Sequence, residues 1–174
     1  GMHMKNIVAL LLGCIIMNTS VQTNTHPVIG KPAANFTLTD DTGAQWQLSK
    51  QHGNIVVLYF YPSDDTPGCT KQACSLRDNY DAFKKIGAVI VGINYDTQKT
   101  HTSFKEKHRL PFTLLSDPDK KVAKLYDAKN WWFLPWPLRK TIIIDATGTI
   151  RAIIPNVDVT THASTVLTKI KELL

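Results

Sequence analysis

The sequence predicts one α/β domain in which a central mixed β-sheet is flanked by helices. Two continuous runs of apolar, β-rich residues, at 55–61 and 88–94, are typical of strands buried inside a parallel sheet. Segments with helical spacing alternate with these runs, which favours parallel strands joined by helical crossovers. Hairpin patterns before and after this series add antiparallel strands. The 174 residues, of which 43% are hydrophobic and 20% charged, suit one compact domain and exclude wholesale disorder.

The first half of the chain is expected to form a hairpin, a buried strand and a long helix. Residues 36–40 and 44–48 alternate apolar with polar side chains around an Asp-Thr-Gly turn, which predicts two antiparallel strands. The run at 55–61 predicts the buried strand. Residues 69–86 carry helical spacing, and Gly87 provides the stop. The apolar positions of this helix are Leu76, Tyr80, Phe83 and Ile86.

The second half continues the alternation. Its expected elements are a strand at 88–94, a helix at 97–108, a short strand at 111–115, a short helix at 120–126, a hairpin of strands at 141–145 and 149–154, and an amphipathic helix at 160–174. The complete order is similar to that of a thioredoxin-like α/β sandwich with an N-terminal β-hairpin extension. No internal repeat interrupts it, so we expect one domain over residues 28–174.

Residues 1–27 are expected to lie outside this domain. The first four, Gly-Met-His-Met, look like a tag remnant. Lys5 and the apolar run at 7–17 then match the charged and apolar regions of a secretory signal, followed by a polar spacer. The stretch ending at Cys14 resembles a bacterial lipobox, in which the Cys carries the lipid. These features predict a periplasmic or membrane-anchored protein. The alternative is a native terminal helix in a cytoplasmic protein.

Charge and cysteine content narrow the function classes. The chain has 20 Lys and Arg against 14 Asp and Glu, a net charge of +6, but the basic residues are scattered. A nucleic-acid partner is therefore not expected, although weak attraction to anionic surfaces is possible. The chain has three cysteines, which are too few for a disulfide scaffold and enough for one redox pair.

The pattern around Cys69 predicts a reactive thiol. Thr66 has the chemistry of a helix N-cap, and Pro67 suits the first helical position. Cys69 then falls in the first helical turn, where unpaired backbone N–H groups and the helix dipole stabilise negative charge. A thiolate is favoured at such a place, and the thiolate is the nucleophilic form of cysteine.

Cys74 follows five residues later. On a regular helix this spacing separates the two Cα atoms by about 8–9 Å. A disulfide tolerates a separation of no more than about 7 Å. The two cysteines can therefore share a helix or be bonded to each other, but both together require local unwinding of the first helical turns.

These residues also carry a family resemblance. The pattern Pro62-x-x-x-Thr66-x-x-Cys69 resembles the peroxiredoxin active-site motif, and the added Cys74 resembles the bacterioferritin-comigratory-protein (peroxiredoxin Q) subgroup. The stretch from Arg139 to residue 145 is similar to the Arg-bearing strand of that family. The resemblance covers roughly residues 28–174.

The resemblance implies a role for each motif residue. Cys69 would be the peroxidatic thiolate, which attacks a hydroperoxide and becomes a sulfenic acid. Thr66 would bind the thiolate and the peroxide, Arg139 would hold the thiolate charged and bind the leaving oxygen, and Pro62 would shield the sulfenate. Cys74 would resolve the sulfenic acid as an intramolecular disulfide. The resemblance also implies a thioredoxin-type dithiol reductant, no metal and no organic cofactor.

One position departs from the family pattern. The sequence also leaves two alternative functions. The family commonly has Glu three residues after the reactive Cys, where this chain has Gln72. The first alternative function is an exported thiol–disulfide oxidoreductase, which would want a Cys-x-x-Cys pair that this chain lacks. The second is a non-catalytic binding module with a structural disulfide.

The histidines offer little support for other chemistry. The spacing of Cys69 and Cys74 with His101 and His108 matches no common zinc module. His101, His108 and His162 are expected at the surface, which disfavours a Cys–His hydrolase.

Residues 130–137 are unusual because they hold three of the four Trp residues in a segment that also contains two prolines and lies just before Arg139. One interpretation is a buried hydrophobic plug. The other is a partly exposed aromatic loop that binds bulky lipid hydroperoxides, touches a membrane surface or forms a dimer contact. We expect a monomer or a weak dimer.

Overall fold

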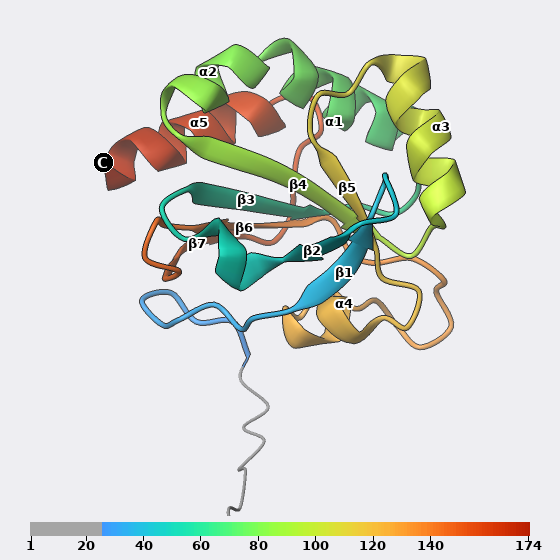
Figure 1. Ribbon diagram of the computed structural model, residues 1–174, viewed down its shortest axis with the longest axis horizontal. Helices are drawn as coiled ribbons and strands as arrows, with labels where there is room; N and C mark the ends of the chain where they lie inside the picture. Colours follow the sequence, from blue (N-terminus) through green and yellow to red (C-terminus); the bar gives the residue numbers. More distant parts are fainter. Residues whose placement is uncertain (1–25) are drawn as a thin grey trace, which may run out of the picture.

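A computed structural model describes residues 26–174, which form a seven-stranded mixed sheet with helices on both sides (Figure 1). The strand order is β2-β1-β5-β4-β3-β6-β7. β3, β4 and β5 are parallel, and the remaining neighbours are antiparallel. The mixed sheet is therefore confirmed, as are the hairpins before and after the parallel centre. The strands are β1 (Thr37–Asp40), β2 (Gln45–Gln47), β3 (Ile55–Phe60), β4 (Ala88–Asn94), β5 (Thr113–Ser116), β6 (Lys140–Ile144) and β7 (Ile150–Ile154).

Most helices cover the same face of the sheet. Figure 1 shows α1, α2, α3 and α5 on one side and the short α4 on the other. A 3-10 turn, η1, follows β2 directly. The bounds are η1 (Leu48–Gln51), α1 (Pro67–Asp78), α2 (Tyr80–Lys85), α3 (Gln98–His108), α4 (Lys121–Leu125) and α5 (His162–Leu173).

The central strand β3 explains the two-sided core. Successive side chains of a strand point to opposite faces, and both faces of β3 are covered. Val57 and Tyr59 join the core beneath α1, α2, α3 and α5, which also contains Cys69. Val56 and Leu58 join the second core on the α4 side. The continuous apolar run of β3 therefore reflects burial on both faces.

The expected helix at 69–86 is wrong in one respect, because it is broken into α1 and α2 at Asn79. Nδ2 of Asn79 donates to the carbonyl oxygen of Ser75 at 2.9 Å. A short amide side chain that bonds to a helix carbonyl competes with the backbone ladder and favours a local break. Gly87 ends the pair with φ +70°, as expected.

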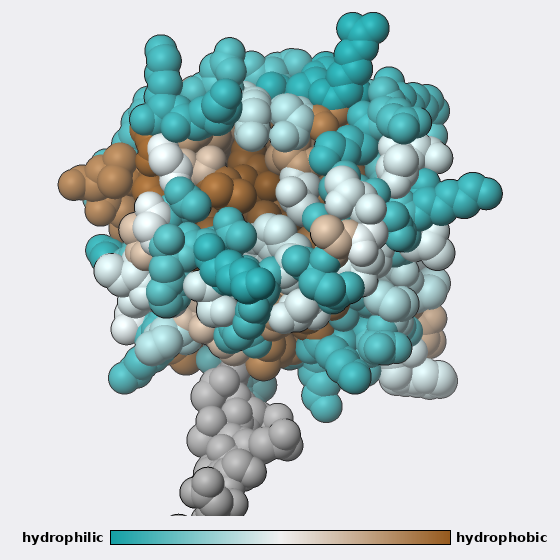
Figure 2. Space-filling model, viewed as in Figure 1, coloured by the Kyte–Doolittle hydropathy of each residue, from teal (hydrophilic) through white to brown (hydrophobic). Residues whose placement is uncertain are grey.

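The surface seen in Figure 2 is mostly hydrophilic, as suits a domain with its apolar runs inside. A hydrophobic projection stands out where Figure 1 marks the carboxyl terminus, and Leu174 there is well exposed. This end of α5 lies away from the first turn of α1 (Figure 1), so the projection is separate from the cysteine region.

Candidate active site

Cys69 lies in the first turn of α1, just beyond the end of β3. Residues 61–66 form the loop between them. Thr66 is the N-cap residue with an extended backbone (φ −86°, ψ 153°), and Pro67 opens the helix as predicted. Cys69 is only 1% exposed. The thiol is thus sheltered from bulk water at a place where free backbone N–H groups favour negative charge.

Arg139 brings its guanidinium directly to this thiol. Nη2 of Arg139 donates to Sγ of Cys69 at 3.2 Å. The approach follows from the sheet, because β6 is antiparallel to β3 and Lys140 is paired with Phe60 at the end of β3. Gly68 leaves the necessary space, since a Cβ there would lie 2.9 Å from Nη2. A charge-assisted bond of this kind stabilises the thiolate over the thiol.

Gln72 lies one turn further along α1 and is fully buried. Its Oε1 accepts a hydrogen bond from Nη1 of Arg139 at 2.8 Å. Its Nε2 lies 3.2 Å from Nδ1 of His162, and Nε2 of His162 lies 2.8 Å from Oγ1 of Thr141. A continuous chain of polar contacts therefore leads from the Cys69 sulfur into the protein interior.

His162 is buried, so its expected surface position is wrong. Burial, with a smaller contribution from the positive charge of Arg139, lowers the pKa of His162 to about 4. The ring is thus neutral near pH 7. The sequence held a signal for this burial, because His162 continues the four-residue spacing of Val166 and Ile170 on α5.

Two other motif residues lie in the loop before Cys69. Oγ1 of Thr66 donates to the carbonyl oxygen of Ser63 at 3.2 Å, and the hydroxyl makes no capping bond to α1. Pro62 is half-buried. The expected contact of Thr66 with the thiolate and peroxide, and the shielding by Pro62, stay predictions.

Cys74 is half-buried on the same helix as Cys69, and both cysteines are free. α1 is continuous from Pro67 to Asp78, so a regular helix holds their Cα atoms about 8–9 Å apart. That separation exceeds what a disulfide tolerates. Formation of a bond between them would require the start of α1 to unwind.

Tyr59 and Tyr61 belong to the same buried core as Cys69. The rings of Tyr59 and Tyr61 stack with centroids 5.1 Å apart. The Tyr59 ring lies against Gly92, where a Cβ would come within 2.8 Å of it. Burial, reinforced by negative charge at Asp64 and the two cysteines, raises the pKa of Tyr59 well above its usual value. The phenol therefore stays protonated near neutral pH.

A second buried network fixes the loop that precedes α1. The carboxylate of Asp64 accepts from Oη of Tyr61 at 2.5 Å, from Nδ2 of Asn94 at 3.0 Å and from Oγ1 of Thr100 at 3.1 Å. Nδ1 of His101 lies 2.6 Å from the same carboxylate. These contacts tie the loop to β4 and α3.

His101 is fully buried and His108 is largely so, which corrects the expected surface positions of both. The spacing of His101, Phe104 and His108 along α3 is that of one helix face. Sequence reasoning thus missed a buried polar residue on each of α3 and α5.

The aromatic segment, residues 131–138, is exposed rather than packed as a plug. Trp131 is 71% exposed and Trp132 is 85% exposed, and Phe133 is also exposed. The segment ends next to Arg139, where N of Leu138 donates to the carbonyl oxygen of Ala128 at 2.8 Å. The exposed aromatic residues therefore precede Arg139 closely in sequence, and the exposed Leu138 is its direct neighbour.

Comparison with known proteins identifies the family. Residues 29–153 match the AhpC/TSA family model. The chain belongs to the AhpC/TSA family. This AhpC/TSA protein is 44% identical over 144 residues to putative peroxiredoxin bcp of Coxiella burnetii, an alignment that covers 80% of this chain and 95% of that relative. It is 49% identical over 127 residues to chloroplastic peroxiredoxin Q of Oryza sativa subsp. japonica, covering 73% of this chain and 58% of the rice protein.

Solved structures agree with this assignment. The crystal structure of peroxidoxin BcpB from Mycobacterium tuberculosis matches with a TM-score of 0.80 and 33% identity, covering 86% of this chain and 99% of that one. The crystal structure of a cysteine-to-serine mutant of PrxQ from Xylella fastidiosa matches with a TM-score of 0.79 and 30% identity, covering 86% and 98%. The expected thioredoxin-like fold and the peroxiredoxin Q/Bcp subgroup are confirmed. The chain spans only 58% of the length of the rice relative.

The expected periplasmic or membrane-anchored location is wrong. The plant relatives of this peroxiredoxin are named as chloroplastic proteins, the bacterial relative is named a putative peroxiredoxin bcp, and none of these names indicates a periplasmic protein. Cys14 and the apolar run at 7–17, on which the expectation rested, lie outside the described residues. Across residues 26–174, none of the helices combines the length and the apolar character that crossing a bilayer requires.

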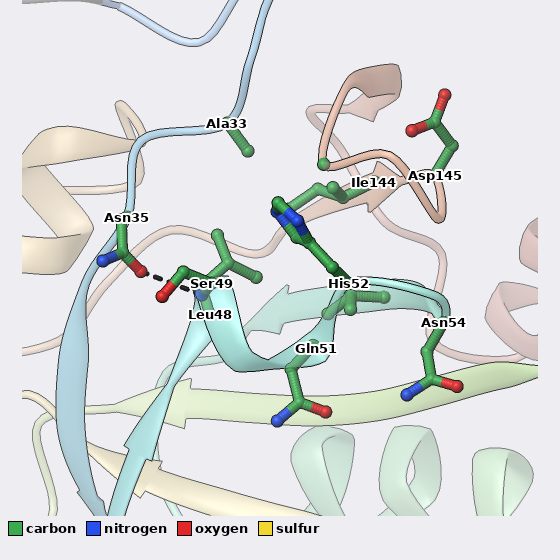
Figure 3. A pocket seen from close by; sticks show the side chains of 11 residues that line it. Ala33, Asn35, Leu48, Ser49, Gln51, His52, Asn54, Ile144 and Asp145 are labelled. Atoms are coloured by element: carbon green, nitrogen blue, oxygen red, sulfur yellow. Dashed lines mark hydrogen bonds between the residues drawn. The ribbon is translucent and has the colours of Figure 1, made fainter.

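A separate small cavity lies at the opposite end of β3. It encloses about 60 Å³, and the His52 ring points into it (Figure 3). N of Ser49 donates to Oδ1 of Asn35 at 2.9 Å on one side of it. Asn54 and Val56 line it at the start of β3, whereas Cys69 follows the end of that strand. The cavity has room for a few water molecules and is not part of the cysteine site.

Metal ligands do not gather in the peroxiredoxin domain. Within residues 26–174, no group of three or more His, Cys, Asp or Glu side chains is arranged to hold a metal ion.

Proposed function

We propose that this chain is a thiol-dependent peroxidase in which Cys69 reduces hydroperoxides. The observation that carries the proposal is the 3.2 Å hydrogen bond from Nη2 of Arg139 to the buried Cys69 sulfur. A cation and a helix N-terminus together favour the thiolate, which is the form that attacks peroxide. Membership of the peroxiredoxin family supports the same activity.

In the proposed reaction the Cys69 thiolate attacks the terminal oxygen of the hydroperoxide. A sulfur–oxygen bond forms as the oxygen–oxygen bond breaks, leaving a sulfenic acid on Cys69. The departing oxygen takes the negative charge, which Arg139 stabilises, and it leaves as water or an alcohol after gaining a proton from solvent. Thr66 would orient the peroxide, and Pro62 would limit access of water to the sulfenic acid.

Cys74 is the proposed resolving residue. Its thiolate attacks the sulfenic acid sulfur, a disulfide forms, and the hydroxyl leaves as water after protonation. The regular helix keeps the two cysteines too far apart, so this step follows unwinding of the start of α1. A thioredoxin-type dithiol would then return two electrons and restore both thiols.

Mass spectrometry of peroxide-treated protein tests the cycle. We expect one equivalent of hydrogen peroxide to lower the intact monomer mass by two hydrogens, without a dimer. Cys69→Ser should abolish peroxide consumption with thioredoxin. Cys74→Ser should retain the first oxidation, lose the disulfide and overoxidise Cys69. Cys14→Ser is the control and should behave as wild type. A Cys74→Ser protein that cycles as fast as wild type would refute the resolving role.

The surroundings of Arg139 favour organic hydroperoxides as substrates. An open depression of about 510 Å³ adjoins Arg139 and Leu138 and is closed on its other side by residues 155–158. The exposed Trp131 and Trp132 lie in the neighbouring aromatic segment. Indole rings prefer membrane–water interfaces. The segment is thus proposed to make peripheral contact with lipid that carries such hydroperoxides.

Trp131→Ser combined with Trp132→Ser tests this contact. The double variant should lose turnover of an organic hydroperoxide while keeping turnover of hydrogen peroxide, and it should lose sedimentation with phosphatidylglycerol vesicles. A double substitution of the exposed Lys84 and Lys85 to Ser is the control, because these side chains belong to α2. Equal losses on both peroxides would contradict the substrate contact. Unchanged sedimentation would contradict the lipid contact.

A further inference from the structure

We infer that Gln72, His162 and Thr141 form a positioning chain that orients Arg139 on the reactive sulfur. The inference rests on the proposed role of Cys69. None of the three residues of the positioning chain makes a hydrogen bond to the Cys69 sulfur, and each acts on it through the next residue. The positioning chain links α1, α5 and the second residue of β6 at one buried point.

The Arg139 guanidinium fixes the direction of every hydrogen bond in the positioning chain. A guanidinium has donors only, so the Gln72 atom that faces Arg139 at 2.8 Å is the carbonyl oxygen. The amide NH₂ must then face His162 and donate to Nδ1, which carries no proton. The ring proton is left on Nε2, which donates to Oγ1 of Thr141 at 2.8 Å.

Because the positioning chain is buried, its order of hydrogen-bond donors and acceptors cannot easily change. Gln72 and Thr141 are fully buried and His162 is 1% exposed, so water cannot replace a lost partner at low cost. If Nδ1 did not accept, the Gln72 amide could rotate and present its NH₂ group to Arg139. Two donors would then face each other, and the guanidinium would lose the contact that sets its angle to the sulfur.

The positioning chain is also electrically neutral. Arg139 is the charged group that acts on the His162 ring, and the titratable ring packed beside it is that of Tyr59, with centroids 6.0 Å apart. The low pKa of His162 and the high pKa of Tyr59 keep both rings uncharged near pH 7. Gln72 holds Arg139 without a countercharge, so the full positive charge acts on Cys69. A carboxylate at position 72 would compete with the thiolate for that charge.

Two substitutions of His162 separate positioning from simple packing. The side-chain oxygen of Asn lies as many bonds from Cα as Nδ1 of His, so His162→Asn can still accept from Gln72. The side-chain nitrogen of Gln corresponds in the same way to Nε2, so His162→Gln keeps a donor for Thr141 and loses the acceptor for Gln72. Both variants remove the ring, which makes them a matched pair.

The readout is the pH midpoint of thiolate absorbance at 240 nm in a Cys74→Ser background, together with the rate constant for hydrogen peroxide. His162→Gln should raise the midpoint by roughly one pH unit and slow the reaction roughly tenfold. His162→Asn should restore most of both quantities. The inference is overturned if folded His162→Gln titrates like the parent protein, or if the two variants are equally impaired.

Gln72→Glu gives a second test that needs no peroxide. A carboxylate cannot donate to Nδ1, so it should favour a proton on that nitrogen and raise the pKa of His162 from about 4 by at least about one unit. The histidine ring resonances followed by NMR against pH report this value. An unchanged value would show that Gln72 does not donate to His162 and would overturn the assigned direction of the positioning chain.

Failure of the proposed function would look different. If Cys69 does not react with hydrogen peroxide in the parent protein, the peroxidase proposal fails. The thiolate titration and the NMR titration would still report whether residues 72, 162 and 141 orient Arg139.

Discussion

Two buried histidines lie near the active site, and their partners give them opposite roles. His101 has acceptors on both sides, the Asp64 carboxylate at 2.6 Å and the carbonyl oxygen of Leu115 at 3.0 Å. Each ring nitrogen of His101 therefore lies within hydrogen-bond distance of an oxygen. His162 has a donor on one side and a hydroxyl on the other, and its pKa is lowered to about 4. The His101 network contains the Asp64 carboxylate and is named the charged network; the His162 network contains a neutral ring and is named the neutral network.

The comparison teaches that the partners of a buried histidine decide which part of the site it holds in place, while burial disfavours a charged ring. The His101 network holds the loop before α1, and the His162 network holds the guanidinium above it. Substitutions in the two networks should accordingly differ in size and in pH dependence.

The largest effect should come from breaking the charged network. Asp64→Asn removes the carboxylate that faces the fully buried His101 ring and accepts from Tyr61. The carboxylate accepts several hydrogen bonds. A hydrogen bond to a charged group contributes about 1.5–3 kcal/mol, so weakening several of them should lower the free energy of unfolding by about 3–5 kcal/mol at pH 7. Urea denaturation measures it. The control is Asp65→Asn at the exposed neighbouring carboxylate, which should change stability little. Equal losses in the two variants would contradict the comparison.

The neutral network predicts a pH effect of known sign. The folded pKa of His162, about 4, lies below its usual 6.5, so between these values the unfolded chain binds a proton that the folded chain does not. Stability should therefore fall as the pH drops from 6.5 towards 4, and this group should account for about 2–3 kcal/mol by pH 4.5. Urea denaturation at pH 7.5 and pH 4.5 provides the values.

His162→Asn removes the titrating ring and should lessen this loss by the same amount. If the variant loses as much stability as wild type over this range, the acid sensitivity comes from other groups.

A smaller effect is expected at the far end of the positioning chain. Thr141→Val keeps the shape of a fully buried side chain and removes the hydroxyl that accepts from Nε2 of His162. A buried donor left without its partner costs about 1–2 kcal/mol, which thermal or urea unfolding at pH 7.5 detects. No change in stability would show that the bond between Thr141 and His162 contributes nothing, which would contradict the positioning chain.

The smallest effect should come from the edge of the charged network. Oγ1 of Thr100 donates to Oδ2 of Asp64 at 3.1 Å from an exposed position on α3. Thr100→Val should lower the free energy of unfolding by only about 0.5 kcal/mol, because water can replace the hydroxyl. A loss larger than that of Thr141→Val would reverse the proposed ranking.

Part of the site could be predicted from the sequence because the residues that indicate it are close together along the chain. Thr66, Pro67 and Cys69 are neighbours in sequence, and helix capping and dipole effects act over one turn, so the start of α1 was predictable. Arg139 lies far from Cys69 along the chain, and it was found through the family resemblance rather than through local physics. Gln72 was noticed as a departure, but its contact with His162 was not.

The histidines whose burial was not predicted show why the other parts of the site could not be derived from the sequence. A histidine on an amphipathic helix can face solvent or core, and the partners that make burial tolerable come from other elements. For His162 they come from α1 and β6, and for His101 from the loop after β3 and from β5. The exposure of Trp131 and Trp132 was equally undetermined, because it depends on what the rest of the fold leaves uncovered.

The sequence by itself determined the order of the elements, the two-sided burial of β3 and the place of Cys69 in the first turn of a helix. These follow from periodicity and capping, which act between residues a few positions apart. Only the tertiary structure decided that Arg139 reaches the sulfur, that Gln72 and His162 stand behind it, and which histidine nitrogen carries the proton. Those facts depend on distances between elements that meet only after the sheet has assembled.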